Sequence, residues 1–327
     1  MAKPLAGRVA LVAGATRGAG RGIATALGEA GATVWCTGRS VTGLNASAAA
    51  SGSSAQAPAG QTTGRPETID ETAALVTKAG GRGIAARCDH LDEAQVKALV
   101  ARVREESGHL DILVNDVWGG DALADWEHPF WEQDVQKGLA MMRTAIDTHL
   151  ITARHAAPLL VERGAGLVVE ITDGDHGGYR GTLYYDLVKN TIIRLAFAMH
   201  DELKPKGVTA LAVTPGFLRS EAMLDHFGVR EENWREGAKK DPNFIASETP
   251  LFVGRAVAAL AADPRVAQKG GRVWASWTLS DEYGFVDADG GRPHWGRHWQ
   301  KAYGHAYYRP YDDGFYAYWR SIHEFRP

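Results

Sequence analysis

The chain has 327 residues, 45% of them apolar, and a formal net charge of -3. This length suits one large α/β domain or two smaller ones, and the apolar fraction is enough for a sizeable core. The near balance of 36 basic and 39 acidic residues creates no basic field for nucleic acid or for an anionic membrane surface, so neither partner is expected.

The two cysteines, Cys36 and Cys88, lie inside or at the end of apolar runs. They are predicted to be buried thiols of a reducing compartment, with no disulfide framework and no metal site. The N-terminal stretch lacks the extended apolar region and cleavage site of a signal peptide. No run approaches the roughly twenty apolar residues that a spanning helix requires. The sequence therefore predicts a cytoplasmic protein.

Short apolar runs alternate with longer segments of helical period, which is typical of βαβ units around a parallel sheet. The predicted strands are 9–13, 33–37, 82–87, 112–114, 166–171, 208–213 and 272–275. The predicted helices are 20–30, 67–79, 93–106, 131–162, 184–203 and 249–262. The pattern predicts an α/β fold of the Rossmann type, a doubly wound sheet of about seven parallel strands with helices on both faces.

Three segments fall outside this alternation. Residues 41–66 are rich in Ala, Ser and Gly and are predicted to be a surface insertion rather than a functional lid. Residues 217–248 form an unusually long connection. Residues 281–327 hold many aromatic side chains, too much apolar area to leave in water. We therefore expect a nucleotide-binding domain over 1–280 and an extension over 281–327 that packs on that domain or on a neighbouring subunit.

A glycine-rich turn joins the first predicted strand to the first predicted helix. Gly14, Gly18 and Gly20 fall in this turn, where missing Cβ atoms let the backbone approach a pyrophosphate at the helix N-terminus. Because the strand, helix and second strand are all present, the turn predicts a dinucleotide site. Thr16 is assigned to the same site.

The residues after the second predicted strand indicate which dinucleotide binds. An acidic residue there would hold the ribose 2′-hydroxyl of NAD. This sequence instead has Arg39 and Ser40, and a second arginine, Arg17, lies inside the glycine turn. Two guanidinium groups and a hydroxyl suit a 2′-phosphate. The predicted cofactor is therefore NADP(H).

Several motifs, in this order, resemble those of the short-chain dehydrogenase/reductase family, and the resemblance runs over residues 7–271. The motifs are the glycine turn, Asp89 on the adenine side, Asn115 in Asn-Asp-Val-Trp, the Tyr-x-x-x-Lys pair Tyr185 and Lys189, and Pro215-Gly216, which in the family closes over the nicotinamide. Residues 115–119 followed by Phe130-Trp-Glu132 are similar to the branch that contains dehydrogenase/reductase SDR family member 1.

The tyrosine and lysine suit reduction of a carbonyl, in which negative charge develops on oxygen and a proton donor is needed. Tyr185 can donate that proton. Lys189 lies one helical turn later on the same face, where its ammonium can lower the pKa of the phenol and hold the nicotinamide ribose. The pair is therefore predicted to be catalytic.

Three departures from the family pattern affect this expectation. The asparagine of the long central helix is matched by Ala145, so a water relay from the lysine to that asparagine is in doubt. Val117 and Trp118 replace small residues and would crowd one wall of the cleft. Asp173 matches the position of the usual serine, directly after Thr172.

Asp173 raises a chemical problem, because a carboxylate would repel the developing alkoxide and raise the pKa of Tyr185. Three arrangements would avoid this repulsion. Asp173 could be protonated by burial, it could turn away to bind backbone N–H groups of the 174–178 loop, or Thr172 could supply the hydroxyl. We favour Thr172 as the partner of Tyr185, with Asp173 turned away, although strand alternation points neighbours to opposite faces.

In the resembled family the segment after the Pro-Gly motif forms the substrate lid, so the resemblance implies that residues 217–248 are this lid. The lid, Trp118 and the aromatic tail indicate an apolar, bulky ketone, aldehyde or quinone-like substrate. The resemblance also implies a homodimer or homotetramer built on the helices predicted at 131–162 and 184–203. Residues that could line its interface are Ile192, Ile193, Leu195, Ala196 and Met199.

Three functions remain open from the sequence. The first is an NADPH-dependent carbonyl reductase with Tyr185 as the acid. The second is an NADP-binding sensor or scaffold that has lost catalysis, against which the retention of both Tyr185 and Lys189 argues. The third is a dehydratase or isomerase that uses Asp173 as its base.

Overall fold

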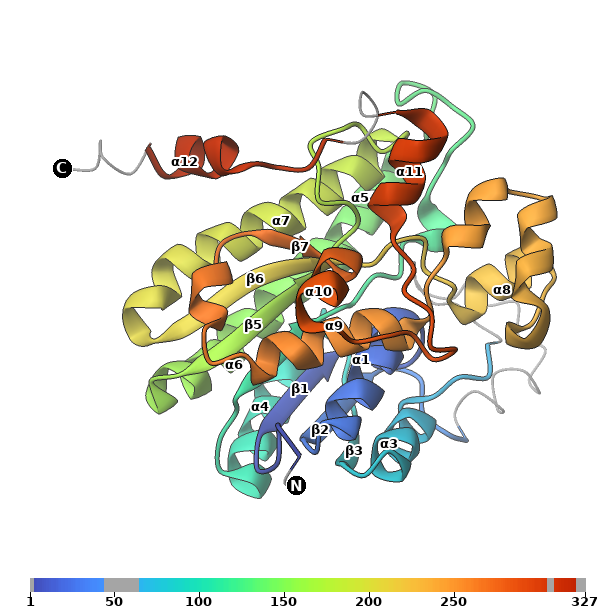
Figure 1. Ribbon diagram of the computed structural model, residues 1–327. Helices are drawn as coiled ribbons and strands as arrows, with labels where there is room; N and C mark the ends of the chain where they lie inside the picture. The colour runs from blue at the N-terminus through green and yellow to red at the C-terminus, as the bar shows by residue number, and fades with distance from the viewer. Residues whose placement is uncertain (1–2, 44–64, 305–308, 322–327) are drawn as a thin grey trace.

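The computed structural model describes residues 3–43, 65–304 and 309–321 (Figure 1). Seven parallel strands form one sheet in the order β3-β2-β1-β4-β5-β6-β7. Their bounds are β1 Val9–Ala13, β2 Thr33–Gly38, β3 Arg82–Arg87, β4 Ile112–Asn115, β5 Gly166–Ile171, β6 Val208–Thr214 and β7 Val273–Ala275. This strand order confirms the predicted Rossmann-type sheet. The sequence could predict it because strands that are buried on both faces appear as continuous apolar runs.

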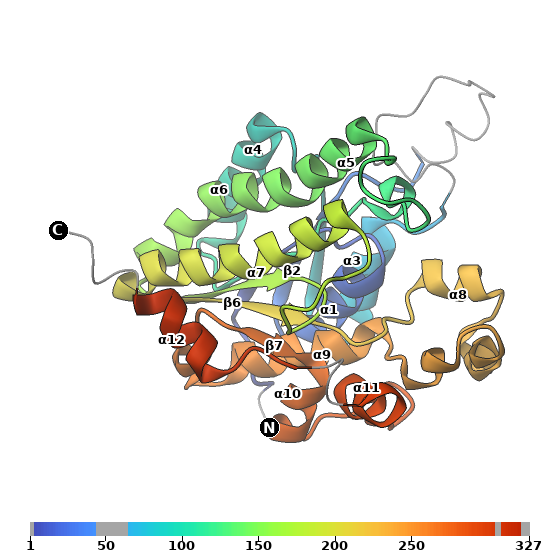
Figure 2. The same ribbon diagram turned by 90° about the horizontal axis from the view of Figure 1, so that it is seen from above.

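Helices cover both faces of the sheet (Figure 2). One face carries α1 Gly18–Glu29, α3 Ile69–Lys78 and α9 Pro250–Ala262, and the other carries α4 Glu93–Ser107, α6 Thr148–Arg163 and α7 Leu183–Leu203. Local sequence sets their ends. Thr68 and Glu71 form a capping box at the start of α3, and Asp92 caps α4, which ends at Gly108 in the left-handed conformation.

The strand order reverses between β1 and β4, and all seven strands point the same way. In such a sheet, ligands bind beyond the carboxyl ends of the strands at the point of reversal. The glycine turn follows β1, Asn115 ends β4, Thr172 follows β5 and Pro215 follows β6. The fold therefore places most of the predicted site residues at one edge of the sheet.

The single helix predicted at 131–162 is wrong. The structure has α5 Val135–Met142, then a π-helical segment, Arg143–Asp147, and then α6. Apolar periodicity cannot reveal such a change, because one wider turn leaves the pattern on either side intact. The π-helical segment contains Ala145, and such segments occur frequently at functional sites.

The long connection after β6 forms a small lid with its own apolar core. It contains α8 Glu221–Phe227 and two 3-10 segments, Glu231–Lys239 and Pro242–Ala246. The rings of Phe227 and Phe244 lie 4.2 Å apart at their centroids, and Trp234 packs against Phe244. Shorter 3-10 segments elsewhere are Asp121–Leu123, Lys204–Lys206 and Val266–Lys269.

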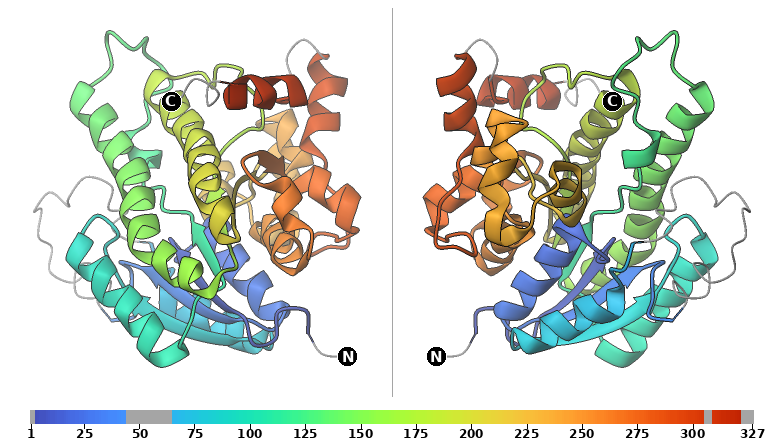
Figure 3. Two further views of the ribbon diagram at one scale, coloured as in Figure 1. Left: turned by 90° about the vertical axis from the view of Figure 1, so that its left-hand side faces the viewer. Right: turned by 90° about the vertical axis from the view of Figure 1, so that its right-hand side faces the viewer.

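The described part of the C-terminal segment forms α10 Ser276–Tyr283, α11 Trp295–Tyr303 and α12 Asp313–Ser321. The expected domain boundary at residue 280 falls inside α10. Figure 3 shows α11 beside the lid, and the ring centroids of Trp295 in α11 and Phe217 at the start of the lid are 5.8 Å apart. Trp319 packs instead near Ile193 of α7.

Most of the predicted surface insertion, 44–64, lies outside the described residues. In the described ranges, no helix is both long enough and apolar enough to cross a bilayer. The same ranges contain no cluster of three His, Cys, Asp or Glu side chains that could hold a metal ion.

Candidate active site

The glycine turn after β1 is too tight for side chains at two of its glycines. A Cβ at Gly14, where φ is +91°, would lie 2.6 Å from the carbonyl oxygen of Asp116, and one at Gly20 would lie 2.3 Å from the carbonyl oxygen of Gly14. A Cβ at Gly18, where φ is +55°, would lie 3.8 Å from Cβ of Ser220, an ordinary van der Waals contact. Thr16 packs against Gly38 at the end of β2, since a Cβ there would lie 2.6 Å from the Thr16 hydroxyl. The backbone therefore forms the cradle that a pyrophosphate requires.

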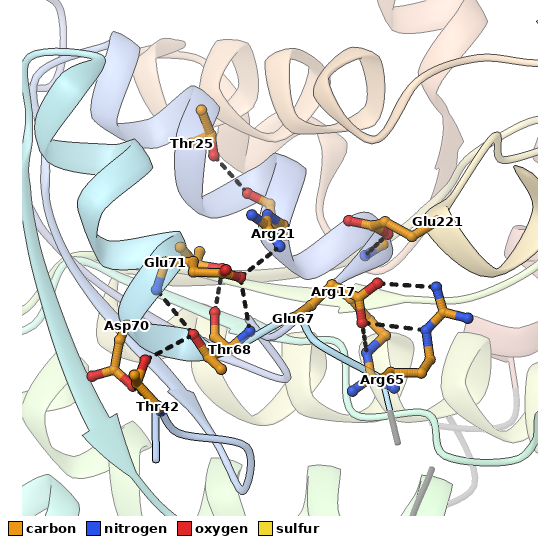
Figure 4. Close-up of polar contacts among 12 residues, drawn as sticks. Arg17, Arg21, Thr25, Thr42, Arg65, Glu67, Thr68, Asp70, Glu71 and Glu221 are labelled. Atoms are coloured by element: carbon orange, nitrogen blue, oxygen red, sulfur yellow. Dashed lines mark hydrogen bonds and ion pairs between the residues drawn. The ribbon is translucent and has the colours of Figure 1, made fainter. Parts of the chain in front are cut away.

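A carboxylate already occupies this cradle. The backbone N–H of Gly18 donates to Oε2 of Glu221 at 2.8 Å, although the two residues are 203 positions apart (Figure 4). Arg17, the N-cap of α1, makes no side-chain capping bond, and the first turn has no acidic residue of its own. The N-terminus of α1 thus binds a carboxylate that comes from a distant segment. A site that binds an anion here suits the phosphates of a dinucleotide, which carry the same sign of charge.

The predicted cofactor arginines lie in two different charged groups. The side chain of Arg17 lies 3.5 Å from Oε2 of Glu67, which also binds Arg65 at 3.0 Å (Figure 4). Burial lowers the pKa of Arg17, and Glu67 partly offsets this. Arg39 lies 4.0 Å from Asp89. Arg65 was missed from the sequence because it lies near the end of the segment 41–66, which was predicted to be a surface insertion.

Backbone contacts at the ends of β2 and β3 fix two more predicted residues. The carbonyl of Ser40 accepts from the N–H of Ile69, which ties the residue to the start of α3. The carboxylate of Asp89 accepts from the N–H of Leu91 at 3.1 Å. Both residues therefore lie just beyond the carboxyl ends of β2 and β3, and their contacts with the adenosine stay a prediction.

Asn115 points into the core and connects two strands. Its amide donates to Oε1 of buried Glu170 at 2.7 Å, and Nδ1 of His149 lies 2.6 Å from Oε2 of the same carboxylate. The other ring nitrogen of His149 lies 3.1 Å from the carbonyl oxygen of Val117. Both ring nitrogens of His149 therefore face acceptor oxygens. These hydrogen bonds hold the backbone beside the cleft in place. Neither Glu170 nor His149 lies in a local motif, so the sequence did not predict them.

Tyr185 and Asp173 meet at the carboxyl end of β5. The phenol donates a hydrogen bond to Oδ2 of Asp173 at 2.9 Å. Burial and the Asp173 carboxylate raise the pKa of Tyr185 well above its ordinary value. The ammonium of Lys189 lies 5.3 Å from the centroid of the Tyr185 ring, and burial lowers the pKa of this lysine. The phenol, the ammonium and the carboxylate therefore form one partly buried group.

The expectation that Thr172 is the partner of Tyr185 and that Asp173 turns away is wrong. The Thr172 hydroxyl is buried and donates to the carbonyl of Lys189 at 2.8 Å, so it secures β5 to α7. The neighbouring residue points the opposite way, as strand alternation requires. Arg180 then holds the Asp173 carbonyl at 2.7 Å and the Asp186 carboxylate at 3.0 Å. These contacts fix the loop with Asp173 facing the phenol.

Aromatic rings form the walls around the phenol. Trp118 meets the Tyr185 ring edge-on at 5.3 Å, and Trp126 lies 5.0 Å from it. The ammonium of Lys189 lies 3.9 Å from the centre of the Trp118 ring, a favourable cation–π distance. Trp118 thus forms the crowded wall that the sequence predicts.

A cavity of about 30 Å³, enough for one water, lies behind these walls. Asp116, Ala145, His149 and Lys189 are among the residues that line it. Burial raises the pKa of Asp116 to about 7, while Lys189, His149 and the N–H of Gly20 act in the opposite direction. The cavity is at the position that the family's asparagine would reach, with Ala145 on its wall.

The Pro215-Gly216 turn is held from two sides. The N–H of Gly216 donates to Oε2 of Glu248 at 2.9 Å, and the Ser276 hydroxyl binds the same oxygen at 2.6 Å. Burial raises the pKa of Glu248 to about 8. A Cβ at Gly216 would lie 2.9 Å from Cβ of Trp295, so α11 covers this turn closely. Glu248 and Trp295 are far from the motif in the sequence, which is why it did not predict them.

Comparisons with known proteins agree with this fold. The family model described as short chain dehydrogenase matches residues 59–227. Dehydrogenase/reductase SDR family member 1 of Mus musculus is 32% identical over 295 residues, which cover 89% of this chain and 86% of that protein. Ketoacyl reductase HetN of a Nostoc strain is 29% identical over 226 residues, 67% of this chain and 66% of that protein. The structure of a hydroxysteroid dehydrogenase from Escherichia coli has a TM-score of 0.62 at 19% identity, covering 83% of this chain and 96% of that one. This chain belongs to the short-chain dehydrogenase/reductase family, in the branch of dehydrogenase/reductase SDR family member 1.

Proposed function

We propose that the protein reduces the carbonyl group of an apolar ketone, aldehyde or quinone-like compound with NADPH. The observation that carries this proposal is the partly buried phenol of Tyr185, with the Lys189 ammonium 5.3 Å from its ring and two tryptophans beside it. NADPH supplies the hydride when it is bound. The ketoacyl reductase among the relatives supports a carbonyl substrate.

The chain's own residues provide the proton and stabilise the charge. Tyr185 holds the proton that the carbonyl oxygen receives, and its raised pKa keeps the phenol protonated at neutral pH. The Lys189 ammonium stabilises negative charge on the phenol and the oxygen. Because a phenolate beside the Asp173 carboxylate is unfavourable, little phenolate is present at neutral pH to act as the base of alcohol oxidation. The same carboxylate makes the phenol a weaker acid, so reduction depends on the Lys189 ammonium to stabilise the charge that develops.

NADP is the preferred cofactor of this proposal, supported by Arg17, Arg39 and Arg65. Changing Arg39→Gln is expected to weaken NADPH binding by roughly ten- to a hundredfold and to leave NADH binding nearly unchanged, because a charge-assisted bond contributes about 1.5–3 kcal/mol. Isothermal titration of both cofactors measures this. Arg265→Gln, at an exposed position near the last strand, is the control. An equal loss for both cofactors would remove Arg39 from the 2′-phosphate site.

The direct test of the function is NADPH consumption by purified protein with a panel of aromatic ketones, aldehydes and quinones. Turnover with at least one of them is expected. Tight NADPH binding without turnover would favour the sensor or scaffold, and absence of any nicotinamide binding would exclude both.

The contact between Asp173 and Tyr185 also supports a second candidate. A carboxylate held 2.9 Å from a phenol can serve as a base in dehydration or isomerisation. This reaction needs no net redox change, so the substrate panel would show no NADPH consumption.

The oligomer we propose is a homodimer or homotetramer through the helices α5, α6 and α7. The residues first expected at its interface are in part wrong, because Ile192, Ile193 and Ala196 are buried in the chain's own core. Leu139 and Leu150 are exposed instead, by 51% and 45%. Light scattering after size exclusion measures the oligomeric state.

Two buried free thiols, Cys36 and Cys88, support the expected cytoplasmic location.

A further inference from the structure

We propose that Glu221 competes with the cofactor's phosphates for the N-terminus of α1, so that the dinucleotide must displace α8 in order to bind. The inference rests on the proposed function, because it takes the glycine turn as the pyrophosphate site. It adds an internal competitor that sets cofactor affinity and couples the lid to cofactor binding.

The first observation is the contact itself. The Gly18 N–H is at the first residue of α1 and points to a side-chain carboxylate of α8 at 2.8 Å. No residue near Gly18 in sequence caps this helix through its side chain. A carboxylate and a phosphate need the same donors and carry the same sign of charge. The two cannot share this N–H, so one must replace the other.

A second contact ties α8 to the cofactor side. Oδ2 of Asp225, one helical turn after Glu221, lies 2.8 Å from Nη1 of Arg65. Arg65 also binds Glu67, which in turn contacts Arg17 (Figure 4). The two acidic residues of α8 thus bind groups that a dinucleotide would use. Phosphates that take these groups would release both contacts together.

The structure shows which part of the lid can move. Buried Arg219 binds Glu231 through two nitrogens and the Ser247 carbonyl at 2.9 Å, so the lid is anchored just before α8. After α8, Gly228 has φ of +67° and can change direction at low cost. A helix of seven residues is too short to be stable by itself and depends on its contacts. Residues 220–228 are therefore held by the Glu221 and Asp225 contacts at one end and by the packing of Phe227 against Phe244 at the other.

The test is cofactor affinity in a charge variant. Glu221→Gln keeps the size of the side chain but removes the charge, so the dissociation constant for NADPH is expected to fall about tenfold in a fluorescence titration. Hydrogen exchange at 220–228 in the cofactor-free protein should become faster. Asp225→Asn should also lower the dissociation constant and speed up the hydrogen exchange, each by a smaller amount than Glu221→Gln does. Glu232→Gln, an exposed lid residue, makes the same change in net charge and should leave both unchanged.

The outcomes separate this inference from the proposed function. NADPH affinity that stays the same or weakens in Glu221→Gln, while the unaltered protein binds NADPH, overturns the competition and leaves the reductase proposal standing. Equal gains in Glu221→Gln and Glu232→Gln also overturn it, because they would reflect net charge alone. Failure of every variant to bind any nicotinamide cofactor overturns both proposals.

Discussion

Tyr185→Phe is expected to lower kcat for NADPH-dependent carbonyl reduction by about 10²- to 10⁴-fold, the range associated with loss of a positioned general acid. The phenylalanine ring keeps the contacts with Trp118 and Trp126 but cannot give a proton to the carbonyl oxygen. NADPH binding should change little, because the phenol is bound to Asp173. Initial rates and a separate cofactor titration measure the two effects.

The matched control is Tyr184→Phe, the same change at the preceding residue of α7. Tyr184 packs against Gly138 of α5, where a Cβ would lie 2.4 Å from its ring, so the ring is needed there and the hydroxyl is not part of the proposed chemistry. Activity close to that of the unaltered protein is expected. If Tyr185→Phe retained most of the activity, Tyr185 would not be the acid, and the proposed mechanism would be wrong.

The sequence predicts the parts of this protein that depend on local patterns. Buried strands read as apolar runs, and the tight turn at Gly14 and Gly20 requires glycine whatever else surrounds it. Tyr185 and Lys189 are marked by the Tyr-x-x-x-Lys motif of the resembled family, and helical spacing puts them on one face. The position of the cleft follows in turn, since parallel strands bring their carboxyl ends to one edge.

The parts that were missed depend on contacts between distant segments. Glu221 reaches Gly18 across 203 positions, and Glu170 joins Asn115 to His149 across two strands and a helix. The direction of Asp173 was misjudged because Arg180, seven residues later, binds its carbonyl and fixes the loop. A residue-by-residue pattern contains no information about these pairings.

Asp173→Ser should separate the two candidate reactions. The carboxylate is one of the causes of the raised pKa of Tyr185, so its removal should lower that pKa and increase the phenolate fraction at a given pH. A like charge at about 4 Å costs on the order of 1–4 kcal/mol, which makes the expected gain in NADP-dependent alcohol oxidation about tenfold or more. The pH midpoint of oxidation should move to lower pH. Rates of oxidation between pH 6 and 10 measure both changes.

Asp173→Asn provides the isosteric comparison, because it removes the charge and keeps a hydrogen-bonding group beside the phenol. Both variants should move the oxidation profile in the same direction, with reduction still dependent on Tyr185. If the unaltered protein converted a substrate without consuming NADPH, and both variants abolished that conversion while leaving NADPH binding intact, the carboxylate would be required for the chemistry. Asp173 would then be the base, and a dehydration or isomerisation would replace reduction as the function of this site.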